Sequence, residues 1–202
     1  NLGEVIVAWS EIEIYNFINS LGGKAAMTNQ NLPSGTDRIF EAINNYSNIS
    51  HYDSIINLQG DMPIINPEDI EKVNIPLQQG FDMGTLVTEL IEDQKKDVNI
   101  TKATIEWINK HKIGKALDFN KNIYDSISNE IYHHVGIYSF RYETLKKFVS
   151  MPPSKNEISQ KLEQLRALDA KMTIGVSYVK DIPISVDTKK DLLEVEKMIK
   201  SL

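Results

Sequence analysis

The order of apolar and polar positions in the first third of the chain follows two periods in turn. Short, nearly continuous apolar runs predict buried β-strands at residues 4–9, 24–28 and 53–58. Between the runs, apolar residues recur at helical spacing and predict a helix from Ser10 to Gly22, a second from Ser34 through about Tyr46, and a third after Pro67. This strand–helix alternation predicts an α/β fold with a parallel sheet, helices on both faces and right-handed crossovers.

The rest of the chain departs from strict alternation. Runs rich in Val, Ile, Thr and aromatic residues predict strands at residues 83–90, 101–108, 114–119, 131–140 and 171–179. A short polar connection typical of a hairpin joins the second and third of these, and Gly136 in the fourth indicates a bulge or a close approach. We therefore predict one domain over residues 1–202, with a mixed, mainly parallel sheet, flanking helices and an antiparallel excursion.

Composition excludes several classes of protein. The 202 residues are 41% hydrophobic and 25% charged, which suits one globular domain with a sizeable core. A net charge of −6 argues against a nucleic-acid-binding protein, but small anionic ligands need only a few local cations and backbone amides. The absence of cysteine excludes disulfides and thiolate chemistry. No apolar stretch approaches the ~18 residues of a membrane span, so we expect no membrane partner and a cytoplasmic protein.

A polar segment, Gln59-Gly60-Asp61, follows the buried run at residues 53–58. In an open parallel sheet, ligands bind beyond the carboxyl ends of the strands. Gly60 would let the backbone approach a ligand, and the Asp61 carboxylate suits Mg²⁺, which takes one or two carboxylates and completes its shell with phosphate and water. The alternative is that Asp61 caps a helix or a turn.

Asp187 stands in a similar place, between a strand-like apolar stretch and the last predicted helix. Taken alone, it reads as the N-cap of that helix. Because the strand ends of a parallel sheet share one rim, Asp61 and Asp187 would instead converge on a metal site with open positions.

A third feature is the segment PSGTDR at residues 33–38, which opens a predicted helix. Ser34 followed by Asp37 resembles a capping box, and the amides of the first turn would face outward beside Gly35 and Arg38. The segment therefore predicts a site for an anion or a base edge, with an ordinary capped surface helix as the alternative.

Five motifs, in order and spacing, resemble those of the 3-deoxy-manno-octulosonate cytidylyltransferase family, the CMP-Kdo synthetases of lipopolysaccharide biosynthesis. They are SGTDR at 34–38, NLQGD at 57–61, HHVGIYSFR at 133–141, KLEQLRAL at 161–168 and SVDTKKDL at 185–192. The resemblance covers nearly the whole chain. It implies a nucleotide-diphospho-sugar transferase-like, Rossmann-like fold, the substrates CTP and Kdo, a Mg²⁺ cofactor and a homodimer.

Matching positions receive roles from this resemblance. It implies that Asp61 and Asp187 bind the magnesium. The cytidine nucleotide would be held by Ser34, Gly35, Arg38 and Gln59.

The sugar side is implied in the same way and falls to Lys121, His134, Glu163 and Gln164. Because Kdo is a carboxylate, we expect Lys121, His134 and Gln164 to donate hydrogen bonds to it. We expect Glu163 to accept hydrogen bonds from sugar hydroxyls. His133 alternates to the opposite face of the strand, where a structural role is expected.

The sequence departs from the family pattern in three places. The stretch between Phe119 and Ile131 is shorter than in typical relatives, and Lys121 stands at about the place of their sugar-binding arginine. Relatives usually read QGDEP where this chain reads QGDMP, so Met62 removes a carboxylate near the expected metal. The family's first strand and its basic phosphate-binding loop, an A-R-x-x-S-x-R-x-P-x-K type pattern, would precede Asn1. We therefore expect residues 1–202 alone to be nearly inactive.

The implied reaction is an in-line attack of the sugar's anomeric hydroxyl on the α-phosphorus of CTP, with pyrophosphate leaving. Catalysis would consist of positioning and charge neutralisation, since such a displacement asks little covalent chemistry of the protein. Three alternatives remain: a cytidylyltransferase for another acidic sugar such as a nonulosonic acid, a non-catalytic nucleotide-binding protein lacking the phosphate loop, and an α/β interaction domain with neither ligand.

Overall fold

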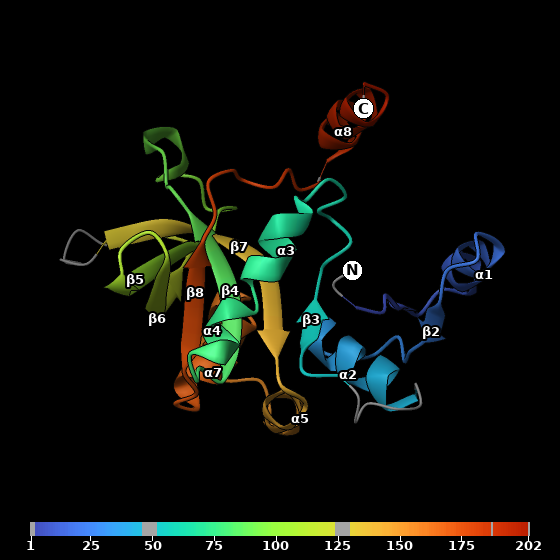
Figure 1. Ribbon diagram of the computed structural model, residues 1–202, viewed down its shortest axis with the longest axis horizontal. Coiled ribbons are helices and arrows are strands. Elements are labelled where there is room, and N and C mark those ends of the chain that lie inside the picture. Colours follow the sequence, from blue (N-terminus) through green and yellow to red (C-terminus); the bar gives the residue numbers. More distant parts are fainter. Residues whose placement is uncertain (1–2, 46–51, 124–129, 187, 202) are drawn as a thin grey trace.

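A six-stranded sheet forms the centre of the protein in the computed structural model, which describes residues 3–45, 52–123, 130–186 and 188–201. The strands, in spatial order, are β3 (Ile55–Asn57), β7 (Glu130–Phe140), β4 (Met83–Thr88), β8 (Ile174–Tyr178), β6 (Ile113–Asn120) and β5 (Lys102–Asn109). β5 also pairs with β7, so the far edge of the sheet curls back toward its middle (Figure 1).

Strand directions place the ends of three strands on one rim. β4 and β8 are parallel neighbours, and β7 runs antiparallel to both β3 and β4. Consequently β3, β4 and β8 point the same way, as the strand–helix alternation predicts. The α/β class, the mixed sheet and the antiparallel excursion are confirmed. Hydrogen-bonded pairs are more often antiparallel than we predicted, because β7 inserts between β3 and β4 and the β5–β6 hairpin extends the far edge.

The predicted irregularity at Gly136 is a β-bulge. Pairing between β4 and β7 shifts register between Thr85 and Leu86, whose partners are Tyr138 and Val135. Gly136 and Ile137 are therefore the extra residues on β7. A bulge bends a strand and re-aims its side chains, and this one lies in the part of β7 that borders the cavity described below.

Each face of the sheet buries its own apolar cluster. On β4, Met83 and Val87 belong to the larger cluster, which includes Phe148 of a helix behind the sheet, whereas Leu86 belongs to a smaller one with Val73. Successive side chains of a strand point to opposite faces, so one strand feeds both clusters. This two-sided burial explains why β4 reads as a continuous apolar run.

The helices are α1 (Ile12–Ser20), α2 (Gly35–Asn45), α3 (Pro67–Lys72), α4 (Ile75–Gln78), α5 (Tyr142–Ser150), α6 (Lys155–Gln160), α7 (Gln164–Asp169) and α8 (Lys189–Ile199), with a short 3₁₀ turn, η2, at Glu92–Gln94. Helices α2, α4, α5 and α7 contact strands of the six-stranded sheet, whereas α1 and α8 stand away from it (Figure 1). Within the described ranges, none of these helices has the length and apolar character needed to cross a membrane.

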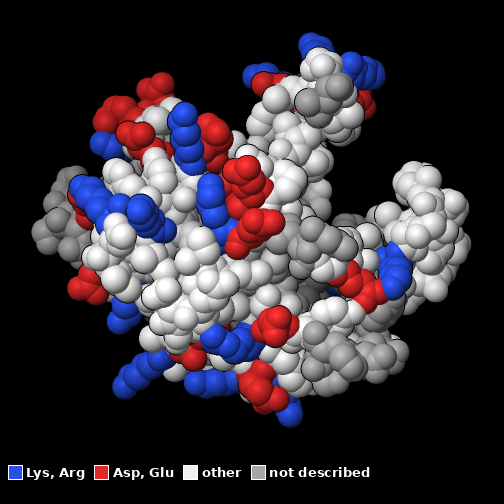
Figure 2. Space-filling view, in the orientation of Figure 1, with Lys and Arg blue, Asp and Glu red and all other residues white. Residues whose placement is uncertain are grey.

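A smaller parallel pair, β1 (Val7–Trp9) and β2 (Ala25–Met27), lies with α1 beyond α2 at one side of the molecule (Figure 1). In the described part of the chain this pair forms a sheet of its own, and it packs on α2. α1 buries none of its residues and leaves Phe17 and Leu21 exposed. Figure 2 shows this region as a largely uncharged surface, whereas Lys, Arg, Asp and Glu are intermingled over the rest of the same face.

Candidate active site

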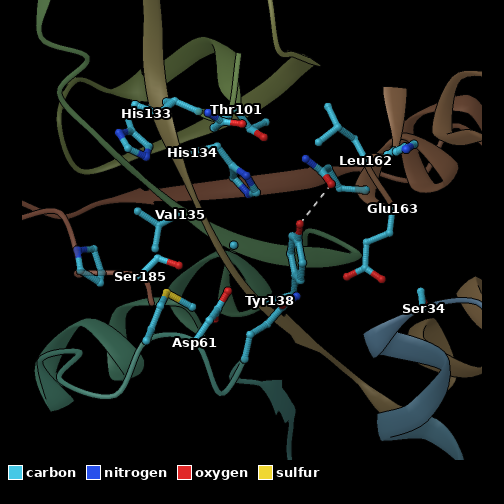
Figure 3. A pocket seen from close by; sticks show the side chains of 18 of the residues that line it. Ser34, Asp61, Thr101, His133, His134, Val135, Tyr138, Leu162, Glu163 and Ser185 are labelled. Carbon is cyan, nitrogen blue, oxygen red and sulfur yellow. Dashed lines mark hydrogen bonds between the residues drawn. The ribbon is translucent and has the colours of Figure 1, made fainter. Parts of the chain in front are cut away.

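A cavity of about 1050 Å³ lies beyond the carboxyl end of β3 and along the first half of β7. Its walls come from segments far apart in the sequence: residues 33–34, 59–62, 97–101, 133–138, 153–164, 182–185 and 191. Figure 3 shows Asp61, His134, Tyr138 and Glu163 around this space. The cavity therefore joins residues of all five motifs that carry the resemblance, with Ser34 as the contribution of the first.

The segment at residues 33–38 forms the N-terminus of α2 beside the cavity. Ser34 lines the cavity, and its hydroxyl donates to Asp37 Oδ2 at 2.6 Å and accepts from the Asp37 backbone N–H at 3.2 Å. This confirms the predicted cap. A Cβ on Gly35 would lie 3.9 Å from the side-chain nitrogens of Asn57 and Gln59, an ordinary contact, so the protein itself leaves room at this position.

Arg38 binds other residues of the protein and, unlike Ser34, does not line the cavity. Its guanidinium donates to Thr28 Oγ1 at 2.6 Å and to the Asn29 carbonyl at 3.4 Å. These bonds tie the first turn of α2 to the end of β2. Arg38 therefore supports the position of Ser34 and Gly35 from behind.

Gln59 and Asp61 both line the cavity just beyond β3, where the sequence predicts them. Asp61 is not a helix cap, because Asn66 caps α3 by accepting from the Glu68 N–H at 3.0 Å. The structure thus excludes the helix cap, whereas Asp61 does lie in a turn, closed by the Met62 N–H bond to the Gln59 carbonyl oxygen at 3.5 Å.

Asp187 lies outside the described residues, but its neighbour does not. The Val186 N–H donates to the Asp61 carbonyl oxygen at 2.8 Å, so the chain arrives beside Asp61 one residue before Asp187. The N-cap of α8 is Thr188, which forms a capping box with Asp191. The capping role considered for Asp187 is therefore filled by another residue.

Met62, which replaces the acidic residue usual in relatives, is 8% exposed and belongs to the smaller apolar cluster with Val73 and Leu86. It also borders the cavity next to Asp61. Its thioether gives the wall beside Asp61 an apolar surface at this point.

His134 has a fixed hydrogen-bonding polarity. Its Nε2 lies 3.0 Å from Thr85 Oγ1, and that hydroxyl donates its only proton to the Ile137 carbonyl at 2.8 Å. Thr85 must therefore accept from Nε2–H, which assigns the tautomer and leaves Nδ1 as an acceptor. Burial lowers the pKa of His134 to about 3, so the ring is neutral near pH 7.

This polarity corrects one expectation. A neutral ring whose only N–H is bound to Thr85 can accept a hydrogen bond at Nδ1 and has no N–H left to donate to a carboxylate. The neighbouring His133 also lines the cavity, although alternation predicts that it turns away, and its Nδ1 lies 3.2 Å from Gln94 Oε1.

Glu163 and Gln164 form another wall of the cavity, and Figure 3 shows Glu163 across the cavity from Asp61. Glu163 Oε1 accepts from Thr36 Oγ1 at 2.9 Å, and burial raises the pKa of this carboxyl. Gln164 is 2% exposed, and its Oε1 accepts from the Tyr138 hydroxyl at 3.1 Å. In the described part of the chain, Glu163 Oε2 and Gln164 Nε2 are buried without a hydrogen-bond partner, so one acceptor and one donor remain available there.

Lys121 stands apart from this wall and does not line the cavity. Its carbonyl oxygen accepts from Lys102 Nζ at 2.8 Å, and Lys102 also donates to the Asp97 carbonyl. Lys102 is 2% exposed, and burial lowers its pKa. The buried lysine thus joins the end of β6 to the loop that borders the cavity at residues 97–101.

Charge around the cavity is strongly one-sided. Among its described lining residues, Lys161 is the only lysine or arginine, whereas five are acidic: Asp61, Asp97, Glu157, Glu163 and Asp191. An anionic ligand would need further cations here. The described residues contain no group of three or more His, Cys, Asp or Glu side chains that could hold a metal ion, but Mg²⁺ needs only one or two carboxylates and fills its remaining positions with ligand oxygens and water. Asp61 at a strand end therefore fits Mg²⁺.

Several functional neighbours escaped the sequence analysis. Tyr138, Thr36 and Arg166 bind the wall residues through contacts between segments distant in the chain. Only Tyr138 carried a usable signal, because it lies four residues after His134 on the same strand and alternation places the two on one face.

Comparison with known proteins identifies the family. A family model described as cytidylyltransferase matches residues 1–174. The 3-deoxy-manno-octulosonate cytidylyltransferase of Paramagnetospirillum magneticum is 38% identical over 202 residues, covering 99% of this chain and 82% of the relative. The enzyme of the same name from Rickettsia bellii is 38% identical over 198 residues, covering 98% and 79%.

Solved structures agree with the sequence relatives. A CMP:2-keto-3-deoxy-manno-octonic acid synthetase complexed with CTP superimposes with a TM-score of 0.84 at 29% identity, covering 99% of this chain and 82% of the other. A UDP-glucose pyrophosphorylase complexed with UDP-glucose has a TM-score of 0.59 at 12% identity, covering 95% and 74%, which is a likeness of fold alone. The chain belongs to the 3-deoxy-manno-octulosonate cytidylyltransferase family.

Proposed function

We propose that this protein transfers the CMP group of CTP to the anomeric hydroxyl of 3-deoxy-D-manno-octulosonate. The bond between the α-phosphorus and the bridging oxygen of pyrophosphate breaks, a bond from the α-phosphorus to the sugar oxygen forms, and the hydroxyl proton is lost. The observation that carries this proposal is the identity of about 38% to curated Kdo cytidylyltransferases along 99% of the chain. The product would serve lipopolysaccharide biosynthesis.

The geometry of the cavity supports the assignment of one wall to the nucleotide and of the opposite wall to the sugar. Ser34, Gly35 and Gln59 lie at the N-terminus of α2 and the end of β3, and we assign them to the nucleotide. The amides of the first turn of a helix suit an anion or a base edge. Arg38 would act on the nucleotide indirectly, by holding this turn against Thr28.

The opposite wall offers the hydrogen bonds that an acidic sugar requires. Gln164 Nε2 is the buried donor, and Glu163 Oε2 and His134 Nδ1 are acceptors for hydroxyl groups. A site built to bind hydroxyl groups rejects analogues that lack them, because its buried polar atoms would then be unpaired. Lys121 does not line the cavity, so we do not assign it to the sugar here, and its expected contact stays a prediction.

Magnesium would be held by Asp61 together with Asp187, the position expected from the sequence. The ion would neutralise charge on the phosphate and lower the pKa of a coordinated hydroxyl. The excess of carboxylates around the cavity supports this proposal, because both substrates are anions. The protein's own residues contribute orientation: Gln59 beside the nucleotide, and Glu163 and Gln164 at the sugar. A homodimer and a cytoplasmic location belong to the same proposal.

The function is tested by measuring pyrophosphate release from the full-length protein with CTP, Mg²⁺ and Kdo, and with each component omitted in turn. We expect release only when all three are present. Replacing Kdo with a nonulosonic acid separates the two sugar classes. Binding of CTP without any release of pyrophosphate would instead favour a non-catalytic nucleotide-binding protein.

A further inference from the structure

The two substrate walls meet at a buried ionic contact that has no part in the roles assigned above. Arg166, on α7, is one of the largest fully buried side chains of the protein, and 1% of its side chain is exposed. It lies two residues beyond Gln164, yet it faces away from the cavity and does not line it. A charge buried this deeply is costly unless it is fully paired.

Pairing of Arg166 connects three helices. Its Nε and Nη2 donate to the two carboxylate oxygens of Glu157 on α6, at 2.9 and 2.6 Å. Its Nη1 lies 3.5 Å from Asp37 Oδ2 on α2. The guanidinium carbon sits 4.6 Å from the ring centre of Phe148 on α5. The bidentate contact fixes the plane of the guanidinium, and a lysine could not reproduce it.

The Asp37 oxygen that faces Arg166 also accepts a hydrogen bond from the Ser34 hydroxyl at 2.6 Å. Ser34 belongs to the proposed nucleotide wall. On the other side, Arg166 shares the six residues of α7 with Gln164, and Glu163 precedes them. The Arg166 guanidinium therefore lies between the two walls. It reaches Ser34 of the nucleotide wall through Asp37, and it belongs to the same helix as Gln164 of the sugar wall.

A second contact runs beside the first. Thr36 Oγ1 donates to Glu163 Oε1 at 2.9 Å and accepts from Asn57 Nδ2 at 3.1 Å. The N-terminus of α2 is thus joined to the start of α7 at two places, although the residues lie 127 and 129 positions apart in the chain. Two attachments fix both the separation and the relative angle of the two helix ends.

We propose that Arg166 is a positioning residue that couples the nucleotide wall to the sugar wall by holding Asp37 and Glu157 at one junction. This inference rests on the proposed function. In-line displacement depends on the placement of the sugar hydroxyl relative to the α-phosphorus, and a misplacement of about 1 Å costs on the order of 10²-fold in rate. The contacts of Arg166 with Asp37 and Glu157 keep that placement by fixing the nucleotide wall relative to the sugar wall.

The diagnostic variants are Asp37→Asn and Arg166→Lys, with Asp82→Asn as the matched control. Like Asp37, Asp82 links segments that are distant in the chain, because its Oδ2 accepts from the Thr173 N–H and hydroxyl, both at 2.8 Å. Unlike the Arg166 contacts, this link lies away from the cavity. KM for CTP, KM for Kdo and kcat are measured in the full-length protein at a temperature where circular dichroism shows every variant folded.

We expect Asp37→Asn and Arg166→Lys each to raise KM for both substrates by about fivefold or more and to lower kcat. The double variant should be no more impaired than Arg166→Lys alone, since Asp37→Asn weakens the Arg166–Asp37 contact that Arg166→Lys already breaks. Asp82→Asn should lower Tm and change each KM by less than about twofold. The inference is overturned if Asp37→Asn affects CTP alone and Arg166→Lys affects Kdo alone, or if the control moves both KM values equally. An inactive wild-type protein would contradict the proposed function instead.

Discussion

Individual side chains around the cavity have their hydrogen-bonding polarity fixed by neighbours that do not themselves face the ligand. Thr85 gives its proton to a backbone carbonyl and so makes His134 an acceptor. Tyr138 occupies the oxygen of the Gln164 amide and so turns the nitrogen into the available donor. Each assignment follows from counting donors and acceptors. The wall therefore offers acceptors and one amide donor, a combination that suits a ligand with hydroxyl groups.

Replacing Gln164 with alanine tests the sugar wall. A lost neutral hydrogen bond that leaves buried polar groups unpaired costs about 1–3 kcal/mol, and about 1.4 kcal/mol corresponds to a factor of ten. We expect Gln164→Ala to raise KM for Kdo roughly tenfold or more and to leave KM for CTP nearly unchanged. Gln78→Ala, at an exposed position on α4, is the control. If CTP is weakened and Kdo is not, Gln164 belongs to the other wall.

The buried His134 predicts a pH dependence of stability. Its folded pKa of about 3 lies below the unfolded value near 6.5, so the unfolded chain binds a proton that the folded chain does not, and stability falls as pH drops below 6.5. After burial, His133 is the charged neighbour that lowers the pKa of His134, and the pKa of His133 is itself lowered by burial and by Lys102. Between pH 7.5 and 5.5, wild type should lose about 1.4 kcal/mol more than His134→Gln in urea unfolding. An equal loss in both proteins would show that His134 remains protonatable in the fold.

Among the secondary-structure elements, α4 approaches the sheet more closely than side chains would permit. It packs on β4 and β8 over Gly84 and Gly175. A Cβ on Gly175 would lie 2.5 Å from Pro76 Cβ and 2.6 Å from Phe81 Cδ2. A Cβ on Gly84 would lie 2.3 Å from the Val73 carbonyl oxygen and 2.4 Å from Ser139 Oγ. Both glycines are therefore required by packing, and substitution of Gly175 would push α4 away from the strands whose ends form the rim.

We expect Gly175→Ala to lower the free energy of unfolding by about 1–3 kcal/mol, the usual cost of overpacking a core. Thermal unfolding followed by circular dichroism measures the effect. Gly136→Ala is the matched control for stability, because Gly136 also lies on a strand but a Cβ added there would meet no atom within 4 Å beyond its chain neighbours. Equal Tm values for the two variants would mean that α4 moves aside at no cost.

At the scale of the whole molecule, the fold brings the ends of β3 and β7 together with α2 and α7 around a single cavity. The strand-end position of Asp61 could be predicted from the sequence, because a buried run followed by Gln59-Gly60-Asp61 is a local pattern. The bulge at Gly136 was predictable for the same reason. Both depend on residues close together in the chain.

What could not be predicted depends on long-range contacts. The placement of β7 between β3 and β4 follows from strand pairing that no local period reveals. Arg166 meets Asp37 across 129 positions, and each residue alone resembles an ordinary helix charge. Lys121 was expected at the sugar from motif spacing, but the end of β6 lies where its carbonyl binds Lys102 and its side chain does not line the cavity.

The proposed metal site is tested by Asp61→Asn and Asp187→Asn in the full-length protein. Each change removes one negative charge from a site that depends on carboxylates, so we expect turnover to be abolished while circular dichroism remains that of wild type. Asp53→Asn, an exposed carboxylate on the amino side of β3, is the control and should retain full turnover. A near-normal rate at saturating Mg²⁺ in either variant would remove that residue from the metal site.

The central claim is the transfer of CMP to an acidic sugar, and the fate of the α-phosphate tests it most directly. Full-length protein is incubated with Mg²⁺, Kdo and CTP labelled at the α-phosphorus. The products are then separated and identified by mass spectrometry. We predict that the label appears in a CMP–Kdo conjugate in equal amount to the pyrophosphate released, and that no conjugate forms without Kdo. Label that stays in CTP, or that appears only as free CMP whether or not Kdo is present, would contradict the claim.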